Sequence, residues 1–273
     1  MKAFCSKYVA KIPNEEGFVY YNEEENQTWK ILYERQMKIV QKRGCDEYLS
    51  GLEKLSFNPE QVPQLPEVSQ KLRQLTGWSV EPVAALISAE DFFGLLANRQ
   101  FPAATFIRTQ EELDYVQEPD IFHELFGHCP MLTEPVFADF VQEYAKFVLS
   151  SEKKNWPLLQ RLFWFTVEFG LIQTAKGLRV YGGGILSSIG ETVYALESDL
   201  PQRQLFNPLV ILRTPYRIDH MQLIYFVIND FQDLYHFAKY NTQRSLDRAH
   251  ELGEFPAVFA VESDNPNIHI HAC

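Results

Sequence analysis

An acidic residue inside a long apolar stretch is the feature that most constrains how this chain can fold. Residues 158–172 read Leu-Leu-Gln-Arg-Leu-Phe-Trp-Phe-Thr-Val-Glu-Phe-Gly-Leu-Ile and follow Pro157, a residue type common in the first turn of a helix. We predict one largely buried helix over this stretch, closed near Gly177. The positions three and four residues from Glu168 hold no cation, and an unpaired buried carboxylate is strongly unfavourable. Glu168 therefore needs a positive partner from elsewhere in the chain.

Two histidines, some forty positions earlier, offer the means to hold a metal ion beside Glu168. His123 and His128 are five residues apart, which places them about 140° apart on an ideal α-helix, unlike the four-residue spacing of zinc hydrolases. We expect a short helix that begins near Asp120 and ends at Pro130, with one histidine near each end. With Glu168 they would form a site of two histidines and one carboxylate.

Simpler explanations exist for each of these side chains. A buried glutamate can have a raised pKa or pair with a distant arginine, and two histidines can be packed or solvated without binding a metal. These alternatives stay open, because a sequence contains no distances. The absence of a local cation near Glu168 nevertheless favours the metal site.

The composition is that of an ordinary globular protein with one domain or two closely packed lobes. The chain has 273 residues, 46% of them hydrophobic, which is enough for a large core. The net charge of −11 and the scattered lysines and arginines argue against nucleic-acid binding. No stretch resembles a signal peptide or a membrane span, and the four separated cysteines form no metal or redox motif. We expect a cytoplasmic protein with reduced thiols.

Hydrophobic periodicity predicts an α+β fold that is predominantly α-helical. After an irregular segment over 1–25, we expect a single domain of packed helices with a few short strands around a central metal cleft. The predicted helices cover 28–42, 46–55, 67–75, 89–97 and 222–240, and extended segments cover 78–87 and 101–108. Three consecutive glycines at 182–184 favour a close approach of the backbone to a ligand.

Three motifs in this order resemble those of the pterin-dependent aromatic amino acid hydroxylases. They are residues 119–130, residues 164–170, and Leu186-Ser187-Ser188 followed by Gly190-Glu191. The resemblance is strongest to the bacterial phenylalanine 4-hydroxylases and extends from about residue 20 to about residue 259. It implies a catalytic domain over 26–260 and a short tail over 261–273 without a tetramerisation helix. A monomer or a homodimer is therefore expected.

The resemblance implies that L-phenylalanine is converted to L-tyrosine with O2 and a reduced tetrahydropterin, such as tetrahydrobiopterin, at a non-haem Fe(II). The iron ligands would be His123, His128 and Glu168. Glu124 would take part in catalysis and contact the pterin. The alternatives are tryptophan hydroxylation on the same scaffold, a zinc-dependent hydrolase with Glu124 as general base, and a non-catalytic, metal-stabilised binding protein.

Further side chains are assigned to the pterin and to the amino acid by the same resemblance. The pterin contacts implied are Val83, Ala85, Ile87, Ala89, Phe92 and Glu124, with the Phe92 ring stacked on the pterin. Arg108, oriented by Asp120, would bind the substrate carboxylate with its planar guanidinium. The other substrate contacts implied are Tyr115, Trp164, Gly184, Ser187 and Val227. Tyrosine hydroxylases carry an acidic residue at the position of Val227, so an apolar residue there suits an unsubstituted phenyl ring.

Taken alone, several of these side chains have ordinary structural explanations. Phe92 and Trp164 would be core aromatic residues. Glu124 would be an exposed helix carboxylate, and Arg108 with Asp120 would be a surface salt bridge. Burial and distances distinguish these explanations from the functional ones.

Overall fold

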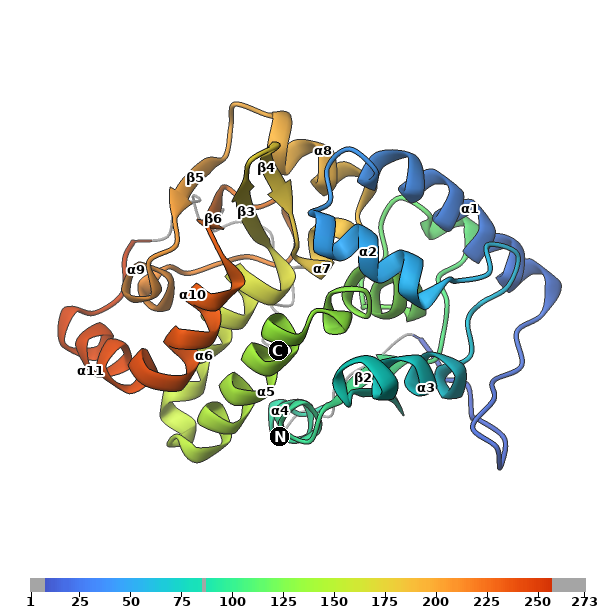
Figure 1. Cartoon of the computed structure of the whole chain (residues 1–273), viewed down its shortest axis with the longest axis horizontal. Coiled ribbons are helices and arrows are strands. Elements are labelled where there is room, and N and C mark those ends of the chain that lie inside the picture. The colour runs from blue at the N-terminus through green and yellow to red at the C-terminus, as the bar shows by residue number, and fades with distance from the viewer. Residues whose placement is uncertain (1–7, 85–86, 257–273) are drawn as a thin grey trace, which may run out of the picture.

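The computed structural model describes residues 8–84 and 87–256 of the chain. Most of this part is helical, and its strands form one four-stranded sheet and one separate pair (Figure 1). The predicted α+β class with predominant helix is therefore confirmed. The pterin contact predicted at Ala85 and the predicted tail over 261–273 lie outside the described residues.

The first half of the chain forms four helices and a pair of parallel strands. They are α1 (Glu23–Val40), α2 (Asp46–Leu55), α3 (Leu65–Thr76), β1 (Ser79–Val83), α4 (Ala89–Ala97) and β2 (Gln100–Ala104). The bounds predicted for α2 and α4 are confirmed. α1 begins at Glu23 rather than at residue 28, because Asn22 and Glu25 form a capping box at its start. Gly77 ends α3 with a φ of 79°, as predicted.

Between residues 135 and 256, the described part of the second half has seven further α-helices and the larger sheet. The helices are α5 (Pro135–Ser150), α6 (Trp156–Phe163), α7 (Gly183–Leu186), α8 (Ile189–Glu197), α9 (Pro208–Arg213), α10 (Phe231–His236) and α11 (Thr242–Leu252). The strands are β3 (Gly170–Thr174), β4 (Gly177–Val180), β5 (Gln202–Leu205) and β6 (Ile224–Ile228). They lie in the order β4-β3-β6-β5, with β3 antiparallel to β4 and the other neighbours parallel.

Short helical segments of other types connect these elements. Three are 3₁₀ turns, namely η1 (Gln110–Glu112), η3 (Met131–Thr133) and η4 (Lys153–Asn155). Three are π-helical, namely η2 (His123–His128), η5 (Trp164–Glu168) and η6 (Phe237–Asn241). Because π-helical turns often mark functional sites, η2 and η5 are the natural places to look for one.

Two predicted helices contain strands and were wrong in those parts. The stretch 158–172 is helical only as far as Glu168 and continues as β3, and the stretch 222–240 begins with β6. Strands buried on both faces are continuously apolar, so they lack the alternation that distinguishes a strand from a helix. The change from helix to strand in the first of these stretches occurs at Gly170, where β3 begins. Only glycine fits there, because a Cβ would overlap the Tyr181 ring and the Thr166 carbonyl. The extended segment predicted over 101–108 forms a strand only up to Ala104.

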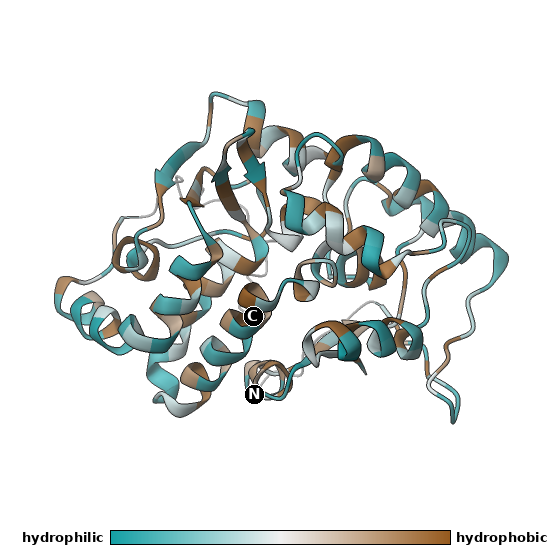
Figure 2. Ribbon diagram, in the orientation of Figure 1, coloured by the Kyte–Doolittle hydropathy of each residue, from teal (hydrophilic) through white to brown (hydrophobic). Residues whose placement is uncertain are grey.

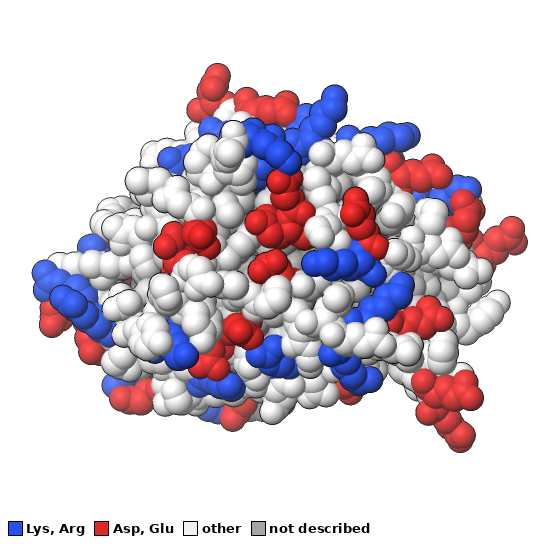
Figure 3. All heavy atoms as spheres, in the orientation of Figure 1, with Lys and Arg blue, Asp and Glu red and all other residues white. Residues whose placement is uncertain are grey.

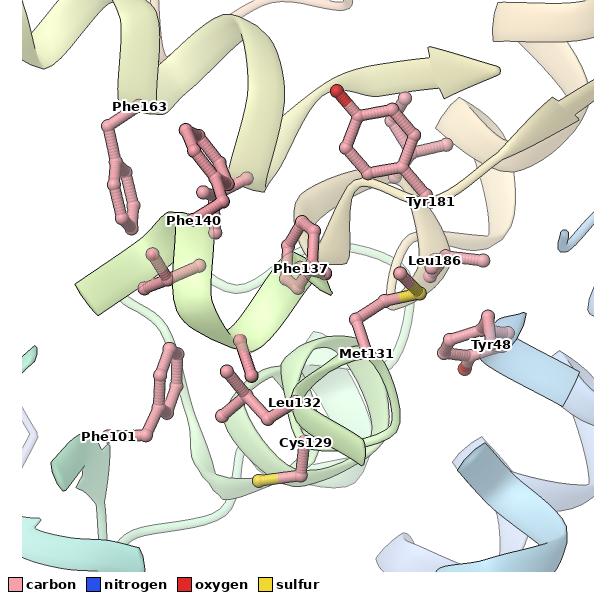
Figure 4. Close-up of a cluster of buried hydrophobic side chains, with 14 of the residues drawn as sticks. Tyr48, Phe101, Cys129, Met131, Leu132, Phe137, Phe140, Phe163, Tyr181 and Leu186 are labelled. Carbon is pink, nitrogen blue, oxygen red and sulfur yellow. The ribbon is translucent and has the colours of Figure 1, made fainter. Parts of the chain in front are cut away.

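One hydrophobic core joins the helices to the sheet, and α5 runs through its centre (Figure 1). Figure 4 shows Phe137 and Phe140 of α5 among other buried side chains of this core. The Phe137 ring meets the Tyr181 ring edge-on at 6.0 Å. Hydrophobic residues fill β6, whereas hydrophilic residues predominate on the outer helices α1 and α11 (Figure 2).

The short helix α7 lies where the two halves of the chain meet. It contacts both η2 and η5. Gln36 of α1 reaches this region, since its Nε2 donates to the Leu186 carbonyl (2.7 Å) and to Thr192 Oγ1 (2.9 Å). α7 is therefore held by a hydrogen bond from the N-terminal helices while it packs against both π-helical segments.

The surface mixes both signs of charge. Figure 3 shows acidic and basic side chains interspersed on the face in view. Among the helices of the described residues, none is both long and apolar enough to span a bilayer.

Candidate active site

The three predicted metal ligands lie in the two π-helical segments η2 and η5. The two histidines begin and end η2, and Glu168 ends η5. Each segment closes with a hydrogen bond between residues five apart, from Cys129 N to Glu124 O (3.3 Å) and from Phe169 N to Trp164 O (2.9 Å). A π turn brings residues at this spacing closer to one face than an α turn does. This geometry explains why histidines five apart can share one ion.

The ligand atoms converge on one point. His128 Nε2 lies 3.1 Å from His123 Nε2 and 3.2 Å from Glu168 Oε2, and His123 Nε2 lies 3.7 Å from that same oxygen. An ion about 2 Å from each ligand requires separations of this size. No other group of three such residues able to hold a metal was found in the described part of the chain. The residues present therefore fit a single metal ion.

Burial differs among the three ligands. The His128 side chain is 3% exposed, whereas those of His123 and Glu168 are 19% and 16% exposed. The site is therefore open to small molecules from the side of His123 and Glu168.

Burial and mutual contact place His123 and Glu168 in the protonation states that metals require. Burial, together with the neighbouring His128, lowers the pKa of His123 to about 4. Burial alone would raise the pKa of Glu168, but the two histidines outweigh it and lower that pKa. At neutral pH the His123 imidazole is neutral and the Glu168 carboxylate is charged.

Ser187 orients the first histidine. Its Oγ lies 2.9 Å from His123 Nδ1 and also donates to the Gly183 carbonyl at 2.9 Å. With its proton directed at that carbonyl, the hydroxyl accepts from Nδ1–H, which leaves Nε2 unprotonated on the side of Glu168. Ser187, assigned by resemblance to the substrate pocket, thus contacts a metal ligand directly.

The three consecutive glycines pack against the other two ligands. A Cβ on Gly183 would overlap the His128 ring, and a Cβ on Gly182 would overlap the Glu168 carbonyl. On Gly184, a Cβ would lie 3.1 Å from Glu168 Oε2. The close backbone approach seen at these glycines is made to residues predicted to bind the metal, whereas the sequence predicted an approach to a bound ligand. Gly182 and Gly183 were not predicted as individual site residues from the sequence, although the run of three glycines was noted.

Arg108 and Asp120 form a buried pair, not a surface salt bridge. Arg108 is 6% exposed and Asp120 is fully buried. The guanidinium Nε and Nη2 donate to the two carboxylate oxygens, each at 2.8 Å. The same carboxylate accepts from the backbone N of His123 at 3.1 Å. Burial would raise the pKa of Asp120, but Arg108 and the backbone donors outweigh it and lower that pKa.

Glu124 is a buried acid, so it is not an exposed helix carboxylate. Among the described residues its carboxylate has no hydrogen-bond partner. Burial, followed by the nearby Glu168, raises the pKa of Glu124 well above its usual value. Such a group beside a metal site is suited to hold a proton near neutral pH.

Trp164 is fixed by contacts that sequence reasoning missed. Its Nε1 donates to Gln222 Oε1 at 3.0 Å. Its ring is stacked on Tyr216 at 4.4 Å and 16°, and tilted against Phe169 at 4.5 Å. Gln222 and Tyr216 lie in the loop 214–223, and no local pattern marks them because tertiary structure brings them to Trp164.

The residues assigned to the pterin lie around the start of α4. Phe92 is partly exposed and meets Phe163 edge-on at 5.3 Å. Val83, Ile87 and Ala89 are also partly exposed. Their pterin contacts stay predictions.

Tyr115 and Val227 are not joined to the metal ligands by any contact found within residues 8–84 and 87–256. Tyr115 is 64% exposed, on the loop that follows η1. Val227 is buried in the sheet, where it pairs with Leu171 of β3 and Leu205 of β5. Their roles in substrate binding stay predictions.

Two histidines and one carboxylate whose ligand atoms lie this close together are the donor set of the mononuclear metal centres found in non-haem iron oxygenases. The family described as biopterin-dependent aromatic amino acid hydroxylases matches residues 2–264. The chain is 51% identical over 254 residues to phenylalanine-4-hydroxylase of Pseudomonas aeruginosa, which covers 93% of this chain and 97% of that protein. It therefore belongs to the biopterin-dependent aromatic amino acid hydroxylase family.

Solved structures agree with this assignment. Phenylalanine hydroxylase from Legionella pneumophila matches with a TM-score of 0.90 and 62% identity, covering 92% of this chain and all of that one. The Chromobacterium violaceum phenylalanine hydroxylase with bound oxidised Fe(III) matches with a TM-score of 0.86 and 40% identity, covering 93% and 92% of the two chains.

Proposed function

We propose that this chain hydroxylates L-phenylalanine to L-tyrosine, with O2 and a reduced tetrahydropterin, at one Fe(II) ion. The observation that carries the proposal is the connection between a metal site and a buried arginine through Asp120, which bonds both Arg108 and the backbone of His123. Family membership supports the pterin. The Fe(III) bound by the Chromobacterium violaceum relative supports the iron, and the name of the Pseudomonas aeruginosa relative supports the substrate.

The protein's part in the metal chemistry is to hold and orient. His123, His128 and Glu168 would hold the iron, which when bound supplies the activation of O2. Ser187 keeps His123 in the tautomer whose Nε2 can bind metal. The glycines of α7 let the backbone lie against His128 and Glu168, so these side chains have little room to turn away.

Arg108 would bind the carboxylate of the amino acid. Its Nε and Nη2 are directed at Asp120, and within the described residues no partner is seen for Nη1. A guanidinium held on one edge by a carboxylate still offers donors on its other edges, and it stays charged when buried. Asp120 therefore sets the direction in which Arg108 can meet a substrate.

The pterin would lie on the side of α4, between Phe92 and Glu124. Phe92 is partly exposed and offers a ring for stacking. Glu124, with its raised pKa, can hold a proton next to a pterin nitrogen or oxygen. In a zinc-dependent hydrolase, Glu124 would instead need to be ionised to act as a general base.

We also propose that the residues 26–260 form one catalytic domain of a cytoplasmic enzyme that is a monomer or a homodimer. The buried free thiols of Cys45 and Cys129 support a reducing compartment. Light scattering of the purified protein measures the oligomeric state, and a tetrameric mass would contradict this proposal.

The decisive experiment is tyrosine formation from phenylalanine with Fe(II), tetrahydrobiopterin and O2. We expect product that depends on both iron and pterin and that is absent from zinc-loaded enzyme. Tryptophan is offered in parallel, and faster hydroxylation of tryptophan would reassign the substrate. Hydrolytic activity with zinc and no oxygen consumption with iron would overturn the proposal.

Arg108→Lys tests the carboxylate clamp. An ammonium cannot reproduce the planar fork, and a hydrogen bond to a charged group contributes about 1.5–3 kcal/mol, so the KM for phenylalanine should rise about tenfold or more. The KM for the pterin should change little. Arg248→Lys, at an exposed ion pair on α11, is the matched control. An unchanged phenylalanine KM in Arg108→Lys would refute the clamp.

A further inference from the structure

Glu191 is a buried carboxylate that the proposed reaction does not use. It lies at the start of α8 and is 7% exposed. Its Oε1 accepts from the backbone N of Gln222 at 2.9 Å and from the hydroxyl of Tyr225. In the part of the chain that the structure describes, no base forms an ion pair with it. Burying a carboxylate without a cation is unfavourable, and hydrogen bonds offset part of that cost.

Gln222 connects the Glu191 carboxylate to Trp164. Its side-chain Oε1 accepts from Trp164 Nε1 at 3.0 Å. Its Nε2 donates to the carbonyls of Arg217 (2.8 Å) and His220 (3.1 Å). Because an indole N–H can only donate and a carbonyl can only accept, these partners allow a single orientation of the amide.

Trp164 is therefore constrained in three ways. Tyr216 is stacked on its ring and Phe169 is tilted against it, and Gln222 fixes the direction of its N–H. Tyr216 and Gln222 belong to the same loop, 214–223, whose far end is tied to Glu191. Trp164 also begins η5, the segment that ends at a metal ligand. Any rotation of this indole takes place one π turn away from the metal site.

We propose that Glu191 and Gln222 are positioning residues for the aromatic substrate. Glu191 holds the backbone at Gln222, and Gln222 sets the rotation of the Trp164 indole, against which the ring of the amino acid lies. The inference rests on the proposed function, which assigns Trp164 to the substrate pocket. Loss of either hydrogen bond leaves the ring stack and the metal ligands in place, so the effect should appear in substrate binding and not in iron or pterin binding.

Gln222→Met is the central variant, because it keeps the length of the side chain and removes the amide. Loss of the hydrogen bond that orients Trp164, which is one of three that the amide makes, predicts a KM for phenylalanine about fivefold higher, with less tyrosine formed per pterin oxidised. Iron content and the KM for the pterin should stay within about twofold of wild type. Gln204→Met, at an exposed glutamine of the edge strand β5, is the matched control and should change none of these.

A double-mutant cycle shows whether Gln222 acts through the indole. Trp164→Phe keeps an aromatic ring but lacks the N–H. If Gln222 acts by orienting Trp164, adding Gln222→Met to Trp164→Phe should raise the phenylalanine KM no further. Effects that multiply in the double variant would overturn the inference.

Two substitutions test the role of Glu191. Glu191→Gln keeps an oxygen that accepts from Gln222 N and from Tyr225, and it should behave like wild type. Glu191→Leu removes the acceptor and should reproduce the phenylalanine KM of Gln222→Met. If Glu191→Leu changes the iron content or the pterin KM as much as the phenylalanine KM, Glu191 is a structural residue and the inference fails.

A spectroscopic readout separates this inference from the proposed function. The near-ultraviolet circular dichroism of Trp164, obtained by subtracting the spectrum of Trp164→Phe, should change in Gln222→Met and in Glu191→Leu without any substrate. Phenylalanine binding by calorimetry should weaken about fivefold in the same variants. If wild type binds phenylalanine but forms no tyrosine, the proposed reaction is wrong while the positioning is still measured. Unchanged spectra and binding would refute the positioning alone.

Discussion

The π-helical segments η2 and η5 present the predicted metal ligands by the same kind of turn, but different forces hold the two segments. η2 is fixed by polar contacts, since Asp120 bonds the backbone of His123 and Ser187 bonds its ring. η5 is fixed by shape, through Gly182 behind it and the aromatic stack around Trp164. Polar contacts depend on charge and protonation, whereas packing depends on volume. The two sides of one metal centre should therefore be sensitive to different substitutions.

Glu168→Gln should have the largest effect, because it removes the only ligand that η5 supplies. A neutral amide replaces a charged ligand, so affinity for Fe(II) should fall by more than the roughly 100-fold that loss of an outer-shell partner can cost. Iron content after dialysis measures this. Glu124→Gln is the control, because it is the same substitution at the residue that follows His123. This variant should keep its iron. Full iron retention in Glu168→Gln would show that Glu168 is not an iron ligand.

Asp120→Asn tests the polar side of the comparison. It leaves the buried Arg108 charge without a counterion, which should lower the free energy of unfolding by about 3–5 kcal/mol. Because folding lowers the pKa of Asp120, the pair stabilises the fold above the ordinary Asp pKa of about 4. That contribution is lost as the pH falls through the lowered folded pKa. Denaturant unfolding at several pH values should show this acid-sensitive part in wild type and not in Asp120→Asn.

Gly182→Ala tests the packing side. The added Cβ would overlap the Glu168 carbonyl and the Gly170 amide, and neither backbone group can move freely. Overpacking of this kind should destabilise the protein by about 1–3 kcal/mol and weaken metal binding as η5 shifts. Gly94→Ala in α4, where a Cβ meets nothing within 4 Å, is the control and should be stabilised by ~1 kcal/mol. Equal melting temperatures for both variants would contradict the packing argument.

Ser187→Ala should have the smallest of these effects on the fold, because it changes little volume and no charge. His123 Nδ1 loses its acceptor, so its ring orientation and tautomer are no longer set. Metal affinity should fall about 10- to 100-fold, as measured by competition with a chelator, while the melting temperature of the metal-free protein stays close to wild type. A change in melting temperature without a change in metal affinity would assign Ser187 to stability instead.

The same contrast explains which parts could be predicted from the sequence. The position of η2 is local, because His123 and His128 carry recognisable chemistry, although Cys129 and Pro130 after it keep right-handed helical dihedrals. The end of η5 is less local, since the apolar run continues past Glu168 and becomes a strand that pairs with both β4 and the distant β6. A sequence pattern cannot show that β3 will pair with a strand that lies more than fifty positions later in the chain.

The surroundings of the site were partly beyond sequence reasoning for a related reason. Arg108 with Asp120 could be paired by resemblance, and the structure adds that the pair is buried. Gln222 and Tyr216 could not be found, because they reach Trp164 only through the course of a loop. The contact of Ser187 with His123 was not predicted, since hydrogen-bond directions depend on backbone geometry that sequence similarity does not contain.

The strand order of the larger sheet also bears on when the metal centre can form during synthesis. Both histidines and Glu168 are made before β6, yet β3, which begins two residues after Glu168, pairs with Phe226, Val227 and Ile228. Until those residues leave the ribosome, β3 has only its hairpin partner β4, and pairings of such sequence separation form slowly. The segment η2 with its two histidines can fold early. The position of Glu168, at the end of η5, is fixed only after β6 has been made and has paired with β3. We therefore expect iron binding to require completion of the sheet, so that a chain truncated before β6 would not retain iron.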